Sequence, residues 1–389
     1  MGIANAIGLT VATLLLLLLA GKPKKHNYDY ALIILVVAIA GFFLAHIWVG
    51  YDLTPGSYVF LELSTAALFT PLVIYALLLI APEHTFRPVW LWFGLPDAVF
   101  VVYIILDLFV GDRLATMTID EVYRNPPFYY FLYHKLQKVY VVAVLIWLLR
   151  QIRRYQKQIR EVYSSTEDVQ LDWMKVFLYM HLVTVILGQI FFIPYNLGYI
   201  ASIELPFAIT SSVFALIMFY MIYHGIKQQV LAIFPHVPEP KHDPPEQTEH
   251  SSSNTSKDDN AVGKYQTSSL SETAMTHLFG ELTRLFEQDA LYLVPDLKVQ
   301  DVAAKLTVTS HNVSQVLNVK AGKSFYDFVN GYRVAHMQRL LAAPETQHFT
   351  ILALANESGF NSKATMNRVF KQHTDMTPRQ YRQRQATMA

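Results

Sequence analysis

The 389-residue sequence contains no cysteine. Disulfide bridges, thiolate metal sites and a cysteine nucleophile are therefore excluded together. The sequence also lacks a zinc-binding motif of the HExxH type, a nucleophile motif and a glycine-rich phosphate loop. We therefore expect neither an enzyme nor a bound metal or cofactor.

Charged residues are scarce as well. They make up 16% of the chain against 53% hydrophobic residues, a low charged fraction for a soluble domain. The deficit is uneven, because residues 1–230 hold nearly all of the long apolar runs, whereas residues 232–389 have the composition of soluble protein. The net charge of +1 averages these two unlike halves and therefore indicates little about partners.

Long apolar runs predict membrane helices, each of which needs about 20 apolar residues. Seven stretches qualify, at roughly 2–20, 30–50, 58–81, 88–110, 128–150, 173–197 and 204–226. The first is interpreted as an uncleaved span, because its lysines follow the apolar run, whereas a signal peptide has its charges before it. Pro194 is expected to end or kink the sixth.

Basic residues in the short loops predict the orientation, because lysine and arginine favour the cytoplasmic side. They follow the first, third and fifth stretches as Lys22, Lys24, Lys25, Arg87, Arg150, Arg153, Arg154, Lys157 and Arg160. Loops 51–57 and 198–203 have none, and loop 111–127 balances two arginines with three acidic residues. We expect a multi-pass protein of the bacterial inner membrane, with the N-terminus outside and everything after Lys227 in the cytoplasm.

A polar segment separates the two halves. Residues 232–264 are rich in proline, serine, acidic residues and histidine and offer almost nothing to bury. Such a segment cannot offset its ordering entropy, so we expect a disordered linker that acts as a tether. A plain domain boundary is the simpler interpretation, and a binding motif is the alternative.

The third segment, residues 265–389, returns to helical periodicity. Its stretch LKVQDVAAKLTVTSHNVSQVLN predicts a helix, a short turn and a second helix, with Val302, Ala303 and Leu306 inward and Thr309 as N-cap. A long amphipathic helix, SFYDFVNGYRVAHMQRLLAA, follows. The small Ala303 suits the close crossing of a helix-turn-helix unit.

A second unit of the same shape follows in ILALANESGFNSKATMNRVFKQHT, with Ser362 as the N-cap of its second helix. Met366, Val369 and Phe370 are expected to pack inward, Lys363, Thr365 and Arg368 to face outward, and Arg333, Phe360 and Tyr381 to be structural. Pro378 is expected in the first turn of a last short helix, where a missing N–H costs little.

These stretches resemble the DNA-binding domain of the AraC/XylS family of bacterial transcription regulators. The resemblance covers about Leu270 to Arg384 and rests on DVAAKLTVTSHNVSQVLN, FVNGYRVAHMQRLL, ILALANESGFNSKATMNRVFK and TPRQYR in the family's order and spacing. It implies two helix-turn-helix units joined by one long helix. Each unit would read a major groove of double-stranded promoter DNA with the first turn of its second helix.

The base-reading positions that the resemblance implies are His311, Asn312, Ser314 and Gln315 in the first unit and Lys363, Ala364, Thr365 and Arg368 in the second. Arg368 suits a bidentate contact to guanine, and Gln315 suits adenine. Two positions depart from the family pattern without touching this surface. Met366 replaces the usual phenylalanine, and Asp375 stands where glycine is common, which puts the local end of that helix in doubt.

Ionisable and polar residues within the spans are costly and often functional. They gather in the outer half of the membrane region, as His46, Glu62, Asp107, His134, Lys135, Lys138, Gln189, Tyr195, Asn196 and Glu204, with Asp97 the deepest acid. Each alone is explained by an interfacial position or by snorkelling. As a group they predict an outward-facing polar pocket.

The fold class expected is all-α: a seven-helix transmembrane sensor in residues 1–231, a disordered linker, and an AraC-type domain with two helix-turn-helix units. We interpret the chain as a one-component regulator that senses an unknown small molecule or environmental signal across the lipid bilayer. Control through homodimer proximity, DNA access or proteolytic release is open. The alternatives are a transporter or intramembrane enzyme with a regulatory DNA-binding tail, although no repeat of spans supports it, and a scaffold that holds a promoter at the membrane.

Overall fold

The computed structural model describes residues 2–21, 25, 27–51, 57–80, 93–106, 117, 119–166, 170–200, 204–227 and 270–388. The chain divides into two compact units, Met1–Gln156 with Asp168–Phe234, and Lys157–Glu167 with Pro235–Ala389. The described residues are nearly all helical and contain no strand, which confirms the all-α expectation. The expected linker, 232–264, lies outside the described residues.

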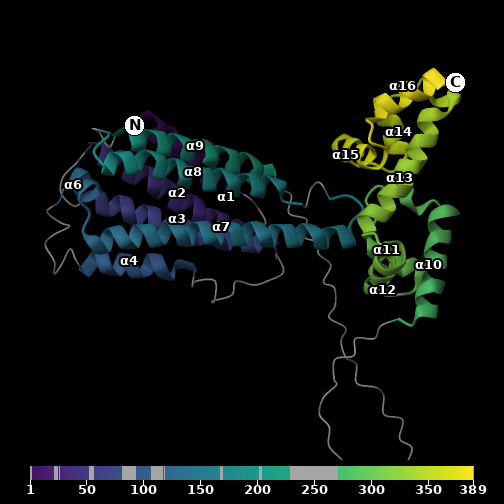
Figure 1. Ribbon diagram of the computed structural model, residues 1–389, viewed down its shortest axis with the longest axis horizontal. Helices are drawn as coiled ribbons and strands as arrows, with labels where there is room; N and C mark the ends of the chain where they lie inside the picture. The colour runs from purple at the N-terminus through teal and green to yellow at the C-terminus, as the bar shows by residue number, and fades with distance from the viewer. Residues whose placement is uncertain are drawn as a thin grey trace, which may run out of the picture. The chain divides into compact units, whose positions relative to one another are not determined.

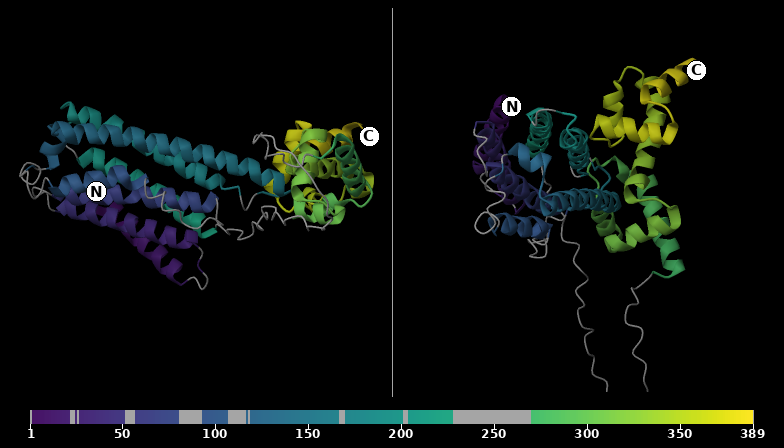
Figure 2. Two further views of the ribbon diagram at one scale, coloured as in Figure 1. Left: turned by 90° about the horizontal axis from the view of Figure 1, so that it is seen from below. Right: turned by 60° about the vertical axis from the view of Figure 1, so that its left-hand side comes forward.

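The first unit is a bundle of long helices (Figure 1). Its elements are α1 (Gly2–Ala20), α2 (Asn27–Tyr51), α3 (Ser57–Ile80), α4 (Leu95–Leu106), α6 (Ile119–Arg124), α7 (Phe128–Val162), α8 (Asp172–Asn196) and α9 (Glu204–Lys227). Helix α2 packs between α1 and α3, and α9 packs against α8 and α1. Two turned views show the same helices side by side along their length (Figure 2).

Three helices in the described part of the chain are long and apolar enough to cross a membrane: Asn27–Trp48, Phe128–Val162 and Asp172–Asn196. The expected number of seven is therefore not confirmed. Helices α1, α3 and α9 contribute shorter apolar stretches. Of the stretch expected at 88–110, the structure describes residues 93–106, which include the 12-residue α4.

The fifth expected span, 128–150, is the start of a much longer helix. Helix α7 runs for 35 residues to Val162 and so includes basic residues that the sequence placed in a loop. Lysine, arginine and glutamine are good helix formers, so nothing in 150–160 stops the helix. Pro194 lies inside α8, which ends at Asn196, as expected for a helix terminated near that proline.

The first unit exposes apolar side chains along its helices. Leu17 is 66% exposed, Ile34 58%, Val139 68% and Leu216 68%. Large apolar side chains exposed along several helices are normal for helices that face lipid. This exposure supports association with a bilayer.

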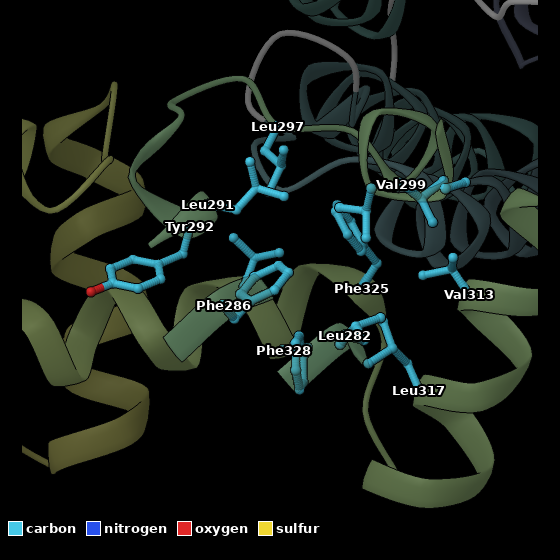
Figure 3. Close-up of a cluster of buried hydrophobic side chains, with 13 residues drawn as sticks. Leu282, Phe286, Leu291, Tyr292, Leu297, Val299, Val313, Leu317, Phe325 and Phe328 are labelled. Carbon is cyan, nitrogen blue, oxygen red and sulfur yellow. The ribbon is translucent and has the colours of Figure 1, made fainter. Parts of the chain in front are cut away.

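The second unit consists of α10 (Glu272–Glu287), η3 (Leu291–Leu293), α11 (Val299–Leu306), α12 (Ser310–Val316), η4 (Leu317–Ala321), α13 (Phe325–Ala342), η5 (Pro344–Thr346), α14 (Ile351–Glu357), α15 (Lys363–Thr374) and α16 (Pro378–Met388). Helix α13 joins two hydrophobic cores. In the first, Leu282 and Phe286 of α10 meet Phe325 and Phe328 of α13 (Figure 3).

The second core forms around the other half of α13. Met337 and Leu341 of α13 pack with Leu354 of α14 and with Val369 and Phe370 of α15. Tyr381 of α16 covers the edge of this cluster, with its ring in T-shaped contact with Phe370 at 5.5 Å. Each core lies directly behind one pair of short helices, so it sets the direction in which that pair presents its outer face.

Candidate nucleic-acid interface

The first candidate recognition helix is α12. Helix α11 ends at Thr307, whose φ of 54° turns the chain, and Thr309 then caps α12 by accepting a hydrogen bond from the N–H of Asn312 at 3.2 Å. Val313 and Val316 are fully buried in the unit, as the periodicity requires. The expected cap is confirmed, as are the inward positions Val302 and Ala303 of α11, while Leu306 is half-buried.

The predicted reading positions of α12 differ in exposure. His311 is exposed, whereas Asn312, Ser314 and Gln315 are half-buried. Gln315 Oε1 is buried and has no hydrogen-bond partner among the described residues. Ser314 Oγ donates to the carbonyl of Glu161 at 3.3 Å. The first turn of α12 is therefore accessible mainly at His311.

The second candidate recognition helix is α15. The turn before it passes through Gly359, whose φ of 85° lies in the left-handed region, and Ser362 caps α15 by accepting from the N–H groups of Ala364 and Thr365 at 3.2 and 3.4 Å. At its far end Asp375 adopts φ 56°. The predicted cap is confirmed, and Asp375 supplies the left-handed residue usually provided by glycine.

One residue of α15 is more buried than the sequence pattern predicts. Lys363 and Ala364 are exposed and Arg368 is half-buried, but Thr365 is only 2% exposed. The expectation that Thr365 faces outward is wrong, because α15 packs against both α13 and α14 and so buries a wider face than its apolar spacing indicates. Lys363, Ala364 and Arg368 form the outward face that a groove can meet.

Arg368 is held in place by α13. Its Nη2 donates to the hydroxyl of Tyr326 at 2.8 Å, and its guanidinium lies 5.7 Å from the centre of that ring. Tyr326 is 1% exposed, and burial raises the pKa of its hydroxyl despite the opposing effect of the Arg368 charge. A guanidinium has five N–H donors, so this bond leaves donors for a guanine edge while fixing the side chain. The sequence did not indicate this role for Tyr326.

Arg333 of α13 bonds to the chain before α11, and its guanidinium lies 5.9 Å from the ring centre of Phe360, in the turn before α15. This 1% exposed side chain donates from Nε to the Tyr292 carbonyl at 2.8 Å and from Nη2 to the Val294 and Pro295 carbonyls at 2.7 and 3.0 Å. Burial lowers the pKa of its guanidinium to about 10, so it stays charged at neutral pH. The predicted structural role of Arg333 is supported by these bonds, which tie α13 to the chain between α10 and α11.

The charge of this region suits a polyanion. From residue 291 onward the sequence has 12 lysines and arginines against 6 aspartates and glutamates, an excess of six positive charges. Such an excess favours phosphate contacts and a salt-dependent affinity.

The first unit contains a cavity of about 290 Å³. The lining includes six members of the predicted pocket set: His46, His134, Lys135, Lys138, Gln189 and Asn196. It also includes His181, which the sequence-based prediction missed. His181 is an ionisable residue inside a span, so the rule that selected the others also applied to it. Aromatic and aliphatic side chains form most of the remaining wall.

The acidic members of the predicted pocket set are placed differently. Asp97 is buried outside the lining, where its Oδ1 accepts from Gln137 Nε2 at 3.0 Å and from the Tyr133 hydroxyl at 3.2 Å. Asp107 lies outside the described residues, as do the side chains of Glu62 and Glu204. No described lining residue is acidic, so the cavity has basic and neutral polar groups in an apolar wall.

Sequence comparison with known proteins supports the interpretation of the C-terminal unit as a helix-turn-helix domain. A model of a helix-turn-helix domain matches residues 302–384. The chain is 29% identical over 92 residues to an uncharacterized HTH-type transcriptional regulator of Staphylococcus aureus (strain COL), a stretch that is 24% of this chain and 12% of that protein. A solved structure of a protein of unknown function from Listeria innocua aligns with 27% of this chain and 94% of that chain, at 23% identity and a TM-score of 0.24.

Residues 302–384 therefore match a helix-turn-helix domain, and this match supports DNA binding by the C-terminal unit. The family match covers the residues that form α12, α13 and α15.

Proposed function

We propose that the protein is a membrane-bound transcription regulator whose C-terminal unit binds double-stranded promoter DNA sequence-specifically. One observation carries this proposal: two capped helices, α12 and α15, each share a hydrophobic core with the long helix α13, within the region matched by the helix-turn-helix domain. Two recognition helices on one support suit two major grooves along one face of a duplex.

The two helices divide the recognition. Arg368, already oriented by Tyr326, makes the bidentate contact to guanine. Gln315, whose Oε1 is buried in this structure, pairs its amide with adenine once that oxygen is exposed. The remaining accessible or half-buried reading positions, His311, Asn312, Ser314, Lys363 and Ala364, lie around these contacts. The excess of basic residues lets the domain associate with DNA before it finds its site.

Arg368→Ala tests this assignment in the full chain. We expect the substitution to reduce discrimination between a promoter fragment and a scrambled duplex by about 10- to 100-fold, which corresponds to the roughly 1–3 kcal/mol of one bidentate base contact. Fragments first mapped on the protein in cells are used in a binding titration at fixed salt. Arg284→Ala, at an exposed position on α10, is the matched control and is expected to leave discrimination unchanged.

Equal discrimination by parent and Arg368→Ala proteins would contradict the contact. Loss in the Arg284→Ala control as well would point to a general effect of removing charge.

The membrane part of the proposal follows the loop charges and the exposed apolar helices. The first unit lies in the bacterial inner membrane with the N-terminus outside, so the DNA-binding unit lies in the cytoplasm. Single cysteines report sidedness cleanly because the chain has none of its own. We expect an impermeant thiol reagent to label Tyr199→Cys, an 83% exposed position, in intact cells and to leave Gln158→Cys unlabelled until lysis. The reverse pattern would overturn the orientation.

The cavity of the first unit is the place for a signal. Lys135 and Lys138, without an acidic residue in the described lining, favour a small molecule with an anionic head, and the aromatic wall favours an apolar body. A two-state regulator responds to such a ligand if one state binds it more tightly.

Octanoate and the neutral octanol, which share the same apolar chain, test the charge preference. We expect octanoate to bind the full chain in detergent at least tenfold more tightly, and Lys138→Met to remove that difference. Lys175→Met, away from the lining, is the control. Equal affinity for the two probes would exclude an anionic signal.

A further inference from the structure

One segment of the N-terminal half belongs to the DNA-binding unit. Residues 157–166, here called the docking segment, comprise the last residues of α7 and the four that follow, and they pack with the helices of residues 270–388. Tyr163, Ser164 and Thr166 are 6%, 0% and 3% exposed, and Val162 packs against the first hydrophobic core. The segment is therefore buried in this unit and is more than a covering on its surface.

Ser164 is the centre of the docking. Its N–H and its Oγ both donate to the carbonyl of Leu297, at 3.1 and 2.7 Å, and Tyr163 forms an antiparallel bridge with Lys298. The Ser164 carbonyl accepts from Asn330 Nδ2 at 3.0 Å, and its Oγ accepts from Arg333 Nη2 at 3.2 Å. A side chain larger than serine has no room at a fully buried position.

The docking segment also contacts the predicted DNA-reading surface of the first helix-turn-helix unit. The carbonyl of Glu161 accepts the hydroxyl of Ser314, and its carboxylate Oε2 accepts from Asn318 Nδ2 at 3.2 Å. Ser314 lies on the α12 face that must enter a major groove about 12 Å wide. A peptide bonded to that face, with a carboxylate beside it, stands where phosphate and base edges belong.

The same segment also contacts residues beside the second helix-turn-helix unit. The Arg160 guanidinium lies 5.2 Å from the ring centre of Tyr326, the residue that also holds Arg368. Ser165 Oγ donates to Asn361 Oδ1 at 3.1 Å, just before the cap of α15. Ten consecutive residues thus contact both helix-turn-helix units and the helix between them.

We propose that the docking segment and promoter DNA compete for this surface, so that the docked form is the closed state of the regulator. This inference rests on the proposed DNA-binding function. Apparent DNA affinity then equals the intrinsic affinity multiplied by the fraction of undocked protein. The segment continues directly from α7, a candidate membrane span, so a signal that changes the end of α7 changes that fraction. The proposed orientation is consistent with docking, because it places the loop after α7 and the C-terminal unit on the same side.

A disulfide lock tests the competition without disturbing the buried centre. The chain has no cysteine, so Glu161→Cys with Asn318→Cys offers a single pair, at positions whose side chains are in contact. We expect the oxidised full chain in detergent to bind a mapped promoter fragment at least tenfold more weakly than its reduced form, with recovery on addition of dithiothreitol. Each single-cysteine variant, treated with the same oxidant, is the control.

Equal binding by the oxidised and reduced forms would overturn the inference, and so would failure of the pair to crosslink under oxidant. If the reduced form and the single variants do not bind the fragment, the proposed DNA-binding function fails and the lock is not the cause.

Ser164→Trp tests the opposite direction. The indole cannot enter the fully buried site, so we expect release of the segment and a gain in apparent affinity of about 10- to 100-fold if the closed form predominates by that ratio. Gln158→Trp, which adds the same side chain at an exposed position of the segment, should bind like the parent. A folded Ser164→Trp protein that binds like Gln158→Trp would contradict the proposal. If Ser164→Trp does not accumulate as folded protein, the disulfide lock decides the question.

Discussion

The two helix-turn-helix units solve the same turn with different residues. In the first, Thr307 takes the left-handed conformation with φ 54°, and in the second Gly359 takes it with φ 85°. A β-carbon at Gly359 would lie 2.6 Å from the Tyr292 carbonyl oxygen and 3.0 Å from backbone atoms of Leu293. Glycine is needed in the second turn because another part of the backbone lies against it.

This contact also makes the packing of the second helix-turn-helix turn depend on residues that precede the first. The Tyr292 carbonyl that faces Gly359 accepts a hydrogen bond from Arg333, and Arg333 in turn holds the chain between α10 and α11. Tyr292 and Leu293, which precede α11, are therefore part of the packing surface of the second turn. A motif repeated in sequence is not repeated in its surroundings.

Arg333→Met should have the largest effect on the free energy of unfolding. It removes the hydrogen bonds that hold residues 292–295 against α13, and the turn of the second helix-turn-helix unit packs on these residues. Three backbone carbonyls of residues 292–295 would lose their charged donor inside the unit, and we expect destabilisation of about 3–5 kcal/mol. Chemical unfolding of the full chain, followed by a signal from the C-terminal unit, measures this loss. Arg339→Met, at an exposed position of the same helix, should change stability by less than about 0.5 kcal/mol. Similar effects of the two substitutions would mean that the units are not joined through Arg333.

A pair of substitutions, one in each turn, tests whether the neighbouring backbone is what requires glycine in the second turn. Gly359→Ala should destabilise by about 2–3 kcal/mol, since it adds both a positive-φ penalty and a clash with rigid backbone. Thr307→Gly should be nearly neutral, because relief of the left-handed strain offsets the added freedom of the unfolded chain. The difference in unfolding midpoint is the measurement. Equal costs at both turns would show that the neighbouring backbone is not what requires glycine.

Tyr326→Phe should have the smallest effect, and it should change only the DNA contacts of the second helix-turn-helix unit. It removes the hydroxyl that holds Arg368 and retains the ring, so we expect a loss of about 0.5–1.5 kcal/mol, or roughly 2- to 12-fold, in promoter affinity. The same titration as for Arg368→Ala measures it, with Tyr332→Phe as the matched control on α13. An unchanged affinity would show that Arg368 needs no fixed orientation.

Much of the C-terminal unit could be predicted from interactions between residues that are close in sequence. The hydroxyl caps Thr309 and Ser362, the inward residues Val369 and Phe370, and the final helix beginning at Pro378 all depend on neighbours within a few residues in sequence. Thr365 was misplaced because its burial depends on how far α15 leans on α13 and α14. Periodicity names the centre of a buried face but does not set its width.

The membrane half was less predictable for related reasons. Apolar runs indicate that a helix is apolar, yet they do not show where it ends, and α7 continues for more than ten residues beyond the expected span. The cavity brings His46, Lys138 and His181 together from three different helices. Their spacing in sequence carries no sign of that meeting, because it depends on helix packing.

Residue type and short-range spacing are enough to predict the composition of the two halves, the absence of cysteine chemistry and the two helix-turn-helix motifs. Long-range packing places residues 157–166 with the C-terminal unit, Tyr326 against Arg368 and Gly359 against Tyr292. These contacts join residues tens to hundreds of positions apart. Their geometry follows from the packing of whole helices, which no local pattern encodes.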